Sequence, residues 1–380
     1  MTPLHQRRRV VLANPSNRRV ALYQAALARL DCDPARVVSY EELLDSRDFS
    51  VLREADVLRI ESPGEDFGVE RRLIAWGADD RAIGSAPRLT ASAAQRLEFD
   101  RGRVAWTRQW YCGFRRLLDE VAAAIAGGGL ELYNSPADIA LMFDKPRCQT
   151  HLDDHGTPTP PRLRQVSDFA ELRDAAAERR WTRLFVKLFH GSSASGVAAV
   201  HLQPDGVRVV TTAELVSGDT GPRIYNNLKM QVYAGDDAAR VVDLLLQEGA
   251  HVERWLQKAT IGDGRGFDLR IVVIAGRPRH VVVRASRSPM TNLHLGNERG
   301  DLDELKLKMG KPRWQSVLDT ASGAAGAFPE SLYVGVDLLV EPGFRRSCVL
   351  EVNAFGDLLP GVLHEGRDTY EWEVLSEGSR

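Results

Sequence analysis

Hydrophobic and polar positions in the first third of the chain follow two different periods. Short apolar runs at Arg9–Ala13, Val37–Tyr40 and Asp56–Ile60 predict buried strands. Apolar residues recur every three to four positions at Arg18–Leu30 and Phe67–Trp76, which predicts amphipathic helices. Strands that alternate with helices at this spacing indicate a parallel sheet. We therefore expect an N-terminal α/β unit.

The remainder of the chain is richer in strands. Helical periodicity recurs in four segments, Arg115–Ala126, Ala137–His155, Val166–Arg180 and Asp237–Gln247. Apolar or alternating runs predict strands at Leu184–Leu188, from Val197, within Gly206–Tyr233, and at Ala250–Trp255, Asp268–Ala275, His280–Arg284, Tyr333–Val340 and Cys348–Val352. Gly127–Gly129 is the clearest linker. We expect an N-terminal α/β domain over residues 1–128 and a second domain over 129–380, with one lobe at about 156–255.

Composition narrows the class of protein. A chain of 380 residues with 43% hydrophobic and 27% charged residues is typical of a folded protein, and excludes disordered and collagen-like chains. The net charge of −2 gives no reason to expect a nucleic-acid partner. The uncharged run Val121–Leu130 is too short to span a membrane, and Met1–Pro15 makes a poor signal peptide. The four cysteines form no C-x-x-C pair, so we expect a cytoplasmic protein without a cysteine-based metal site.

Candidate phosphate ligands gather around residue 190. The segment Gly191–Gly196 holds only Gly, Ser and Ala between two expected strands, and its N–H and hydroxyl groups suit phosphate oxygens. It is not a Walker A loop, because no Gly-Lys-Ser/Thr follows; a flexible hairpin tip is the alternative. Lys187 precedes it in an apolar strand, where a cation needs an anion. Lys145 is another of only seven lysines, and a solvated helix residue is the alternative for it.

Hard oxygen ligands interrupt two later apolar strands. Asp337 lies in the middle of Tyr333–Val340, and Glu351 and Asn353 are two apart in the next strand, so their side chains share a face. Adjacent strands would bring the three side chains together, which is what Mg²⁺ bound to nucleotide phosphates requires. The alternative is a pair of edge acids neutralised by surface arginines.

From Asn134 to Pro360 the chain resembles the ATP-grasp superfamily, most closely the branch with glutathione synthetase and the enzymes that add glutamate to a ribosomal-protein C-terminus. The motifs occur in the superfamily's order: Lys187 with Gly191–Gly196, the hinge-like Val252–Leu256, Asp268–Arg270, Thr291–Gly296, Asp337, and Glu351–Asn353. The resemblance implies an α/β fold of ATP-grasp type, with a preceding α/β domain and a two-lobed domain built on antiparallel sheets.

The resemblance also implies an ATP site. Lys145 and Lys187 would contact the phosphates. The mobile phosphate loop would contain Gly191, Ser192, Ser193 and Gly196. Glu253 and Arg254 would hold adenine, largely through the backbone of the hinge, and Asp268 would lie at the ribose side.

The implied reacting centre follows the nucleotide. Arg270 and Arg284 would face the transferred phosphoryl group, and Asn292 would lie beside the reacting atoms. Two Mg²⁺ ions would be bound by Asp337, Glu351 and Asn353, with Glu351 bridging. The chain departs from the branch at Met290, where arginine is usual; Arg287 is the candidate substitute.

These roles imply an ATP-dependent ligase that joins a carboxylate to an amine or a thiol through an acyl phosphate and releases ADP and phosphate. Small molecules and peptides are both open as substrates, and the oligomeric state is open, a homo-oligomer included. Two alternatives use the same residues: a small-molecule kinase with a hydroxyl acceptor, and an ATP-binding regulatory protein without turnover.

Other signals are weaker. Glu61 and Ser62 end a strand of the α/β unit, where ligands bind in such sheets, so they are substrate-site candidates. His151 and His155 have metal-ligand spacing, but Leu152 occupies the position of a zinc-protease base. The long segment from Val197 to Ala250 exceeds the usual loop-to-hinge length, and its part at Ser217–Tyr233 is a candidate wall of the substrate pocket.

Overall fold

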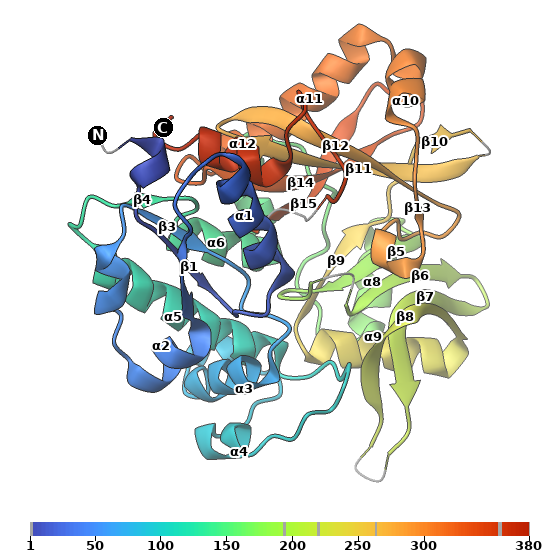
Figure 1. Ribbon diagram of the computed structural model, residues 1–380. Helices are drawn as coiled ribbons and strands as arrows, with labels where there is room; N and C mark the ends of the chain where they lie inside the picture. Colours follow the sequence, from blue (N-terminus) through green and yellow to red (C-terminus); the bar gives the residue numbers. More distant parts are fainter. Residues whose placement is uncertain (1–2, 193–194, 219–220, 263, 356–358, 380) are drawn as a thin grey trace.

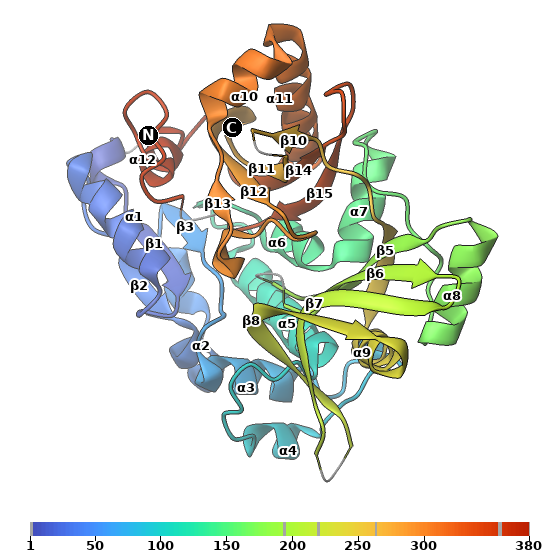
Figure 2. The same ribbon diagram turned by 90° about the vertical axis from the view of Figure 1, so that its right-hand side faces the viewer.

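The computed structural model describes residues 3–192, 195–218, 221–262, 264–355 and 359–379. Three β-sheets organise these residues (Figures 1 and 2). The first sheet lies on the blue, N-terminal side of Figure 1, the second on the green and yellow side below, and the third in the orange and red part above. None of the described helices is long and apolar enough to cross a membrane.

The first sheet is parallel throughout, as the alternation of strands and helices predicts, and its strand order is β2-β1-β3-β4. The strands are β1 (Arg9–Ala13), β2 (Arg36–Ser39), β3 (Val57–Ile60) and β4 (Glu131–Leu132). The helices of this part are η1 (Leu4–Gln6), α1 (Arg18–Arg29), α2 (Tyr40–Ser46), η2 (Ser50–Glu54), α3 (Phe67–Trp76), η3 (Arg81–Ile83), α4 (Ala91–Gln95) and α5 (Thr107–Ile125). Strand β4 follows the glycines of the expected linker, so the sheet continues past residue 128; the domain division itself stays a prediction.

The second sheet is antiparallel, with the order β8-β7-β6-β5-β9. Its strands are β5 (Arg183–Leu188), β6 (Val197–Gln203), β7 (Gly206–Val216), β8 (Arg223–Ala234) and β9 (Ala250–Arg254), and its helices are α8 (Phe169–Glu178) and α9 (Gly235–Gln247). This sheet has a hydrophobic core separate from that of the rest of the molecule. The expected hairpin within Gly206–Tyr233 is confirmed by β7 and β8.

The third sheet is also antiparallel, with the order β13-β12-β11-β14-β15 and β10 paired to β11. Its strands are β10 (Thr260–Ile261), β11 (Arg265–Ile274), β12 (Arg277–Ser286), β13 (Glu298–Arg299), β14 (Tyr333–Val340) and β15 (Ser347–Asn353). The accompanying helices are η4 (Leu293–Leu295), α10 (Leu302–Met309), α11 (Lys311–Gly326) and α12 (Thr369–Leu375). One core cluster joins this sheet to the first one.

The expectation of one helix over Ala137–His155 is wrong. The segment forms α6 (Pro136–Phe143) and α7 (Lys145–Asp154), which are separated at Asp144. The Asp144 side chain accepts a hydrogen bond from the backbone N–H of Arg147 at 3.2 Å and caps α7. Pro146 in the first turn of α7 suits a helix start. This break places Lys145 at the beginning of a helix.

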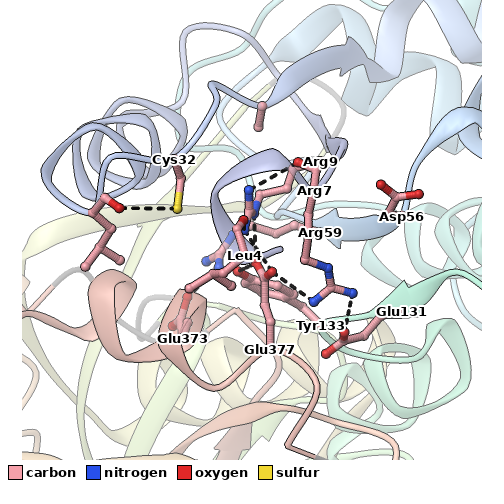
Figure 3. A network of polar contacts seen from close by, with 12 residues as sticks. Leu4, Arg7, Arg9, Cys32, Asp56, Arg59, Glu131, Tyr133, Glu373 and Glu377 are labelled. Atoms are coloured by element: carbon pink, nitrogen blue, oxygen red, sulfur yellow. Dashed lines mark hydrogen bonds and ion pairs between the residues drawn. The ribbon is translucent and has the colours of Figure 1, made fainter. Parts of the chain in front are cut away.

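A buried arginine ties the first sheet to α12. Arg59 on β3 is 1% exposed and bonds Glu61 at 2.7 Å and Glu373 of α12. The aromatic rings of four tyrosines surround its guanidinium at 4.7–5.2 Å, namely Tyr23, Tyr133, Tyr333 and Tyr370. Figure 3 shows the neighbouring network, in which Arg9 bonds Glu377 at 2.9 Å and Arg7 bridges Glu377 and Glu131. Residues from both ends of the described chain therefore share one polar core.

The hairpin β7–β8 is fastened to the first part of the chain. Asn226 N donates to Gly102 O at 2.6 Å, Val104 N donates to Ile224 O at 3.0 Å, and the Tyr225 hydroxyl donates to Asp100 at 2.9 Å. A Cβ at Gly102 would lie 2.9 Å from the Asn226 carbonyl oxygen, so the close approach requires glycine. Figure 2 shows the hairpin reaching toward the region of α4.

We predict that Arg59→Met destabilises the fold strongly. The substitution keeps the volume but leaves Glu61 and Glu373 buried without their cation, which costs about 3–5 kcal/mol of unfolding free energy. Urea unfolding measures the loss. The control Arg36→Met removes an exposed pair with Glu54 and should lose far less. Removing one of the two orphaned carboxylates with Glu373→Gln in the Arg59→Met background should recover part of the loss. Equal stability of Arg59→Met and wild type would contradict the prediction.

A second prediction concerns pH. Glu248, 8% exposed after α9, accepts a hydrogen bond from Thr107 N at the start of α5, and burial raises its pKa to about 7 from 4.5. A carboxyl with a raised folded-state pKa contributes less stability as pH rises from about 4.5 to 7. Glu248→Gln should remove this loss. The unfolding free energy of the variant, relative to that of wild type, should therefore increase between pH 4.5 and 7. Urea titrations at several pH values test it against the exposed control Glu178→Gln; parallel pH profiles for Glu248→Gln and wild type would refute it.

Candidate active site

One cavity of about 360 Å³ collects most of the candidate residues. The loops after β1 and β3, the start of α7, strand β5 with its following loop, the segment after β9, and strands β11, β12, β14 and β15 all contribute to its lining. The predicted residues in the lining are Ser62, Lys145, Lys187, Gly191, Ser192, Glu253, Arg254, Asp268, Arg270, Arg284, Asn292, Asp337, Glu351 and Asn353. Among the described residues, the lining holds seven lysines and arginines and five acids. An excess of positive charge in a concave site favours anionic ligands.

Strand register aligns the charged residues of the third sheet. Asp268 pairs with Arg284 across β11 and β12, Arg270 pairs with Asp337 across β11 and β14, and Asp337 pairs with Glu351 across β14 and β15. Because side chains opposite each other or two apart in a sheet point to the same face, these five charged residues share one face of the third sheet, and together with Asn353 we call them the charged row. The row ends with Asn353, opposite Gly335. The expectation that β14 and β15 lie side by side is confirmed.

The row is internally neutralised. Arg284 bonds Asp268 at 2.7 Å and Asp337 at 3.1 Å, and Arg270 bonds both oxygens of Asp337. Burial acts to raise the pKa of the Asp268 carboxyl, but Arg284 and Lys258 hold it well below its usual range. Lys258 bonds Asp268 at 3.0 Å and the Thr291 hydroxyl at 2.8 Å. The aspartate is therefore a permanent anion between two cations.

Two further lysines reach the cavity from other elements. Lys145 at the start of α7 bonds Glu351 at 2.7 Å and donates to the Gly191 carbonyl at 2.6 Å. Lys187 on β5 bonds Glu253 on β9 at 2.6 Å. Burial acts to lower the pKa of Lys187, but the Glu253 charge raises it above its ordinary value. Both lysines line the cavity, where their amino groups can bind phosphate oxygens.

The small-residue loop turns back closely on itself. Ser195 N donates to Ser192 O at 2.8 Å, and a Cβ at Gly191 would lie 2.8 Å from the Ser195 carbonyl oxygen. Gly196 has φ +62°, and a Cβ there would lie 2.3 Å from Leu188 Cδ1. Both glycines are therefore required by the conformation. Ser193 lies outside the described residues, and Gly196 does not line the cavity.

The Glu253 side chain is held within the protein. It is 1% exposed and bonds Lys187, His251 at 2.8 Å, and Gln149. Burial acts to raise its pKa, but Lys187 and His251 keep that carboxyl well below its usual range. Arg254 is exposed, and its guanidinium lies 5.9 Å from the Trp181 ring centre. Glu253 and Arg254 both line the cavity, and the Glu253 carboxylate is engaged by Lys187 and His251, whereas the Arg254 side chain is exposed.

The three weaker substrate candidates fare differently. Ser62 lines the cavity and accepts a hydrogen bond from Gly64 N at 3.2 Å. Glu61 does not line the cavity, because its side chain turns to Arg59 in the buried tyrosine cluster. Arg287 is exposed and is also outside the lining. None of the described residues of Ser217–Tyr233 lines the cavity, although β8 lies against η4, the turn after Asn292, so the expected role of this stretch as a pocket wall stays a prediction.

Several lining residues have no role assigned to them in the sequence analysis. Lys258 and Thr291 hold Asp268, and the rarity of lysine is the signal that could have singled out Lys258. Asn17 and Arg19 lie at the start of α1 in the cavity wall. Arg19 is one of many arginines in the chain, so composition alone does not distinguish it.

Comparisons with solved structures place this arrangement of sheets among known folds. D-cycloserine synthetase DcsG superposes with TM-score 0.55 at 15% identity, covering 97% of this chain and 98% of that one. Macrocyclase MdnC from Microcystis aeruginosa MRC, solved with its precursor peptide, gives TM-score 0.51 at 11% identity, covering 97% and 98%. ATP-grasp ligase PsnB gives 0.50 at 15% identity, covering 92% and 91%. The chain has the ATP-grasp fold. No family model and no curated protein sequence matches it.

The ATP-grasp fold agrees with the sequence-based fold class, while the expected branch of the superfamily remains a prediction. Within the described residues, no group of three or more His, Cys, Asp or Glu side chains is placed to hold a metal. The candidate metal set contains two carboxylates and an amide instead. Asn353 donates its Nδ2 to Gly335 O at 3.2 Å, which leaves its carbonyl oxygen for another partner.

Proposed function

We propose that the protein is an ATP-dependent carboxylate–amine or carboxylate–thiol ligase that forms an acyl phosphate and releases ADP and phosphate. The observation that supports it most is that Asp337, Glu351 and Asn353 lie on one face of the third sheet, where Arg270 and Arg284 bond Asp337. The same cavity contains Lys145, Lys187 and part of the loop that begins at Gly191. The similar PsnB was solved with Mg and ADP, and MdnC with a precursor peptide.

The chain's residues fit ATP and magnesium. Asp337 and Glu351 supply carboxylate oxygens, and the Asn353 amide orientation leaves an oxygen, which is the donor set that Mg²⁺ prefers. We infer that Asp337, Glu351 and Asn353 would hold two Mg²⁺ ions. Magnesium would supply charge neutralisation at the phosphates. Lys145 and Lys187 would hold phosphate oxygens, under the loop from Gly191 to Gly196. The hinge would hold adenine, and Asp268 would lie on the ribose side.

The reaction would place negative charge beside the arginine pair. The carboxylate oxygen of the first substrate attacks the γ-phosphorus, the bond to the ADP oxygen breaks, and an acyl phosphate forms. The amine or thiol then attacks the acyl carbon, and phosphate leaves with the bonding electrons. Arg270 and Arg284 would stabilise the charge on the transferred group, and Asn292 would orient the reacting atoms. The arginines are already fixed by Asp268 and Asp337, so little reorganisation is needed.

The substrates are one carboxylate and one amine or thiol, and the cytoplasm remains the expected location. The decisive experiment incubates the protein with ATP, Mg²⁺ and a pool of metabolites or peptides, followed by mass spectrometry. A ligase yields a product that weighs the sum of two components less water, with one ADP per product. A stable phosphorylated product without any amine requirement would indicate the kinase alternative. ATP binding without turnover of any pool would indicate the regulatory one.

We predict that Lys187→Met weakens ATP binding. The change removes a charge-assisted contact to phosphate, so affinity should fall by roughly tenfold or more. Calorimetric titration measures it. Lys311→Met, on the exposed start of α11 outside the cavity, is the matched control and should bind ATP as wild type does. Unchanged affinity in a folded Lys187→Met protein would remove Lys187 from the phosphate site.

We predict a larger effect on chemistry for Glu351→Gln. The amide keeps the size but exchanges a ligand oxygen for an NH₂ group, which does not bind a metal. ADP formation should fall by at least about 100-fold while nucleotide binding weakens only in part. Glu341→Gln, in the turn between β14 and β15 and outside the cavity, should keep the wild-type rate. Near wild-type ADP formation by Glu351→Gln would refute the metal assignment.

A further inference from the structure

Arg19 differs from five of the other six cations of the cavity; the sixth, Arg254, is exposed to water. Lys145, Lys187, Lys258, Arg270 and Arg284 each form an ion pair with a carboxylate of the cavity wall. The guanidinium of Arg19 lines the same cavity and, within the part of the chain that the structure describes, forms no hydrogen bond or ion pair. Five cavity cations are therefore neutralised by carboxylates, whereas Arg19, which is half-buried, has no counter-charge among the described residues.

The Arg19 side chain is also partly withdrawn from water. It is half-buried, and its Nε is shielded from solvent and has no hydrogen-bond partner. A donor that loses water and gains no partner costs free energy, and a charged donor costs more than a neutral one. Burial raises the pKa of the nearby Tyr370 hydroxyl, and the Arg19 charge offsets part of that rise. A phenol is not a counter-ion at neutral pH, so the cation stays uncompensated.

The position of Arg19 is well defined by the fold. It occupies the first turn of α1, where the Asn17 side chain accepts from the Arg19 backbone N–H at 2.9 Å. Asn14 donates to the carbonyls of Pro63 and Gly64, both at 3.0 Å, and so fixes the loop after β1 to the loop after β3. These two loops lie at the carboxyl ends of adjacent parallel strands, where ligands bind in open α/β sheets. The wall that presents Arg19 is thus separate from the lysines and the acidic row.

We propose that Arg19 binds an anionic group of the substrate other than the carboxylate that receives the phosphoryl group. The substrate class is therefore an acid with a second carboxylate or a similar anion, free or as part of a peptide. A guanidinium binds a carboxylate through two parallel hydrogen bonds, which fixes orientation as well as position. Arg19 is a specificity-determining residue, and the inference rests on the proposed ligase function because it assumes that a substrate acid enters this cavity.

The first test uses hydroxylamine, which attacks an acyl phosphate at carbon, releases phosphate and gives a stable hydroxamate. Wild type, Arg19→Gln and the control Arg18→Gln are supplied with Mg·ATP and a panel of amino acids, dicarboxylates and short acidic peptides. Arg18 is exposed in the same helical turn and does not line the cavity. For each accepted acid, the analogue with its second anion converted to an amide is measured beside it.

We expect accepted acids to bear a second anion, and their KM to rise on the order of tenfold or more in Arg19→Gln with little change in kcat. The preference for the acid over its amide should shrink in Arg19→Gln and persist in Arg18→Gln. ATP affinity should be unchanged in both variants. An accepted acid without a second anion, or an undiminished acid-to-amide preference in Arg19→Gln, would overturn the proposal.

The second test does not require turnover. Phenylglyoxal modifies accessible arginines, and peptide mass spectrometry measures the rate at each one in the Mg·ADP complex. The same acid panel should slow the modification of Arg19, whereas the amide analogues should not. Arg254 on the nucleotide side should be protected by Mg·ADP and unaffected by the acids. Arg19 modification that no acid slows would overturn the proposal. Protection of Arg19 with no hydroxamate from any acid would refute the ligase and keep only the anion-binding site at Arg19.

Discussion

Asp268 and Asp337 lie in the third sheet with almost no access to water, and each depends on arginines from neighbouring strands for neutralisation. Their pairing with Arg270 and Arg284 fixes the register of three strands as well as the charge of the site. A slip of one residue in β14 would move Asp337 to the opposite face of the sheet and leave Arg270 beside an apolar side chain. The same contacts that hold the sheet together therefore position the arginines for a ligand.

The cavity lies between parts that are stabilised differently. The first and third sheets share a hydrophobic core, whereas the second sheet with α8 and α9 has its own. One lysine connects across this division, because Lys145 bonds both Glu351 and the loop after β5. Lys187 is ordered by Glu253 within the second sheet. An anionic ligand bound to Lys145 and Lys187 would therefore contact the second sheet and the remainder of the protein at the same time. The tie between the β7–β8 hairpin and Gly102 limits how far the second sheet can move away from the first.

Much of this arrangement could be predicted because the determining signals are local. A two-residue period in the apolar strands places Glu351 and Asn353 on one face, and a lysine inside an apolar strand marks Lys187. Glu61 shows the limit: the end of a strand was the right place for a ligand, yet its side chain turns to Arg59 and so toward α12, over 300 residues away. Arg19 shows a second limit, because the sequence does not reveal which side chains surround an arginine in the folded protein, and so cannot reveal that it lacks an acidic partner among the described residues. The helix break at Asp144 could have been predicted only by recognising that the Asp144 side chain caps the helix that follows.

The bond between Arg59 and Glu373 spans 314 positions of sequence. At translation rates of about 5–20 residues per second, β3 leaves the ribosome on the order of tens of seconds before α12. During that time Arg59 and Arg9 have no access to Glu373 and Glu377, so the polar centre of the first sheet cannot be completed. The first sheet can therefore reach its final state only after Glu373 and Glu377 have been synthesised.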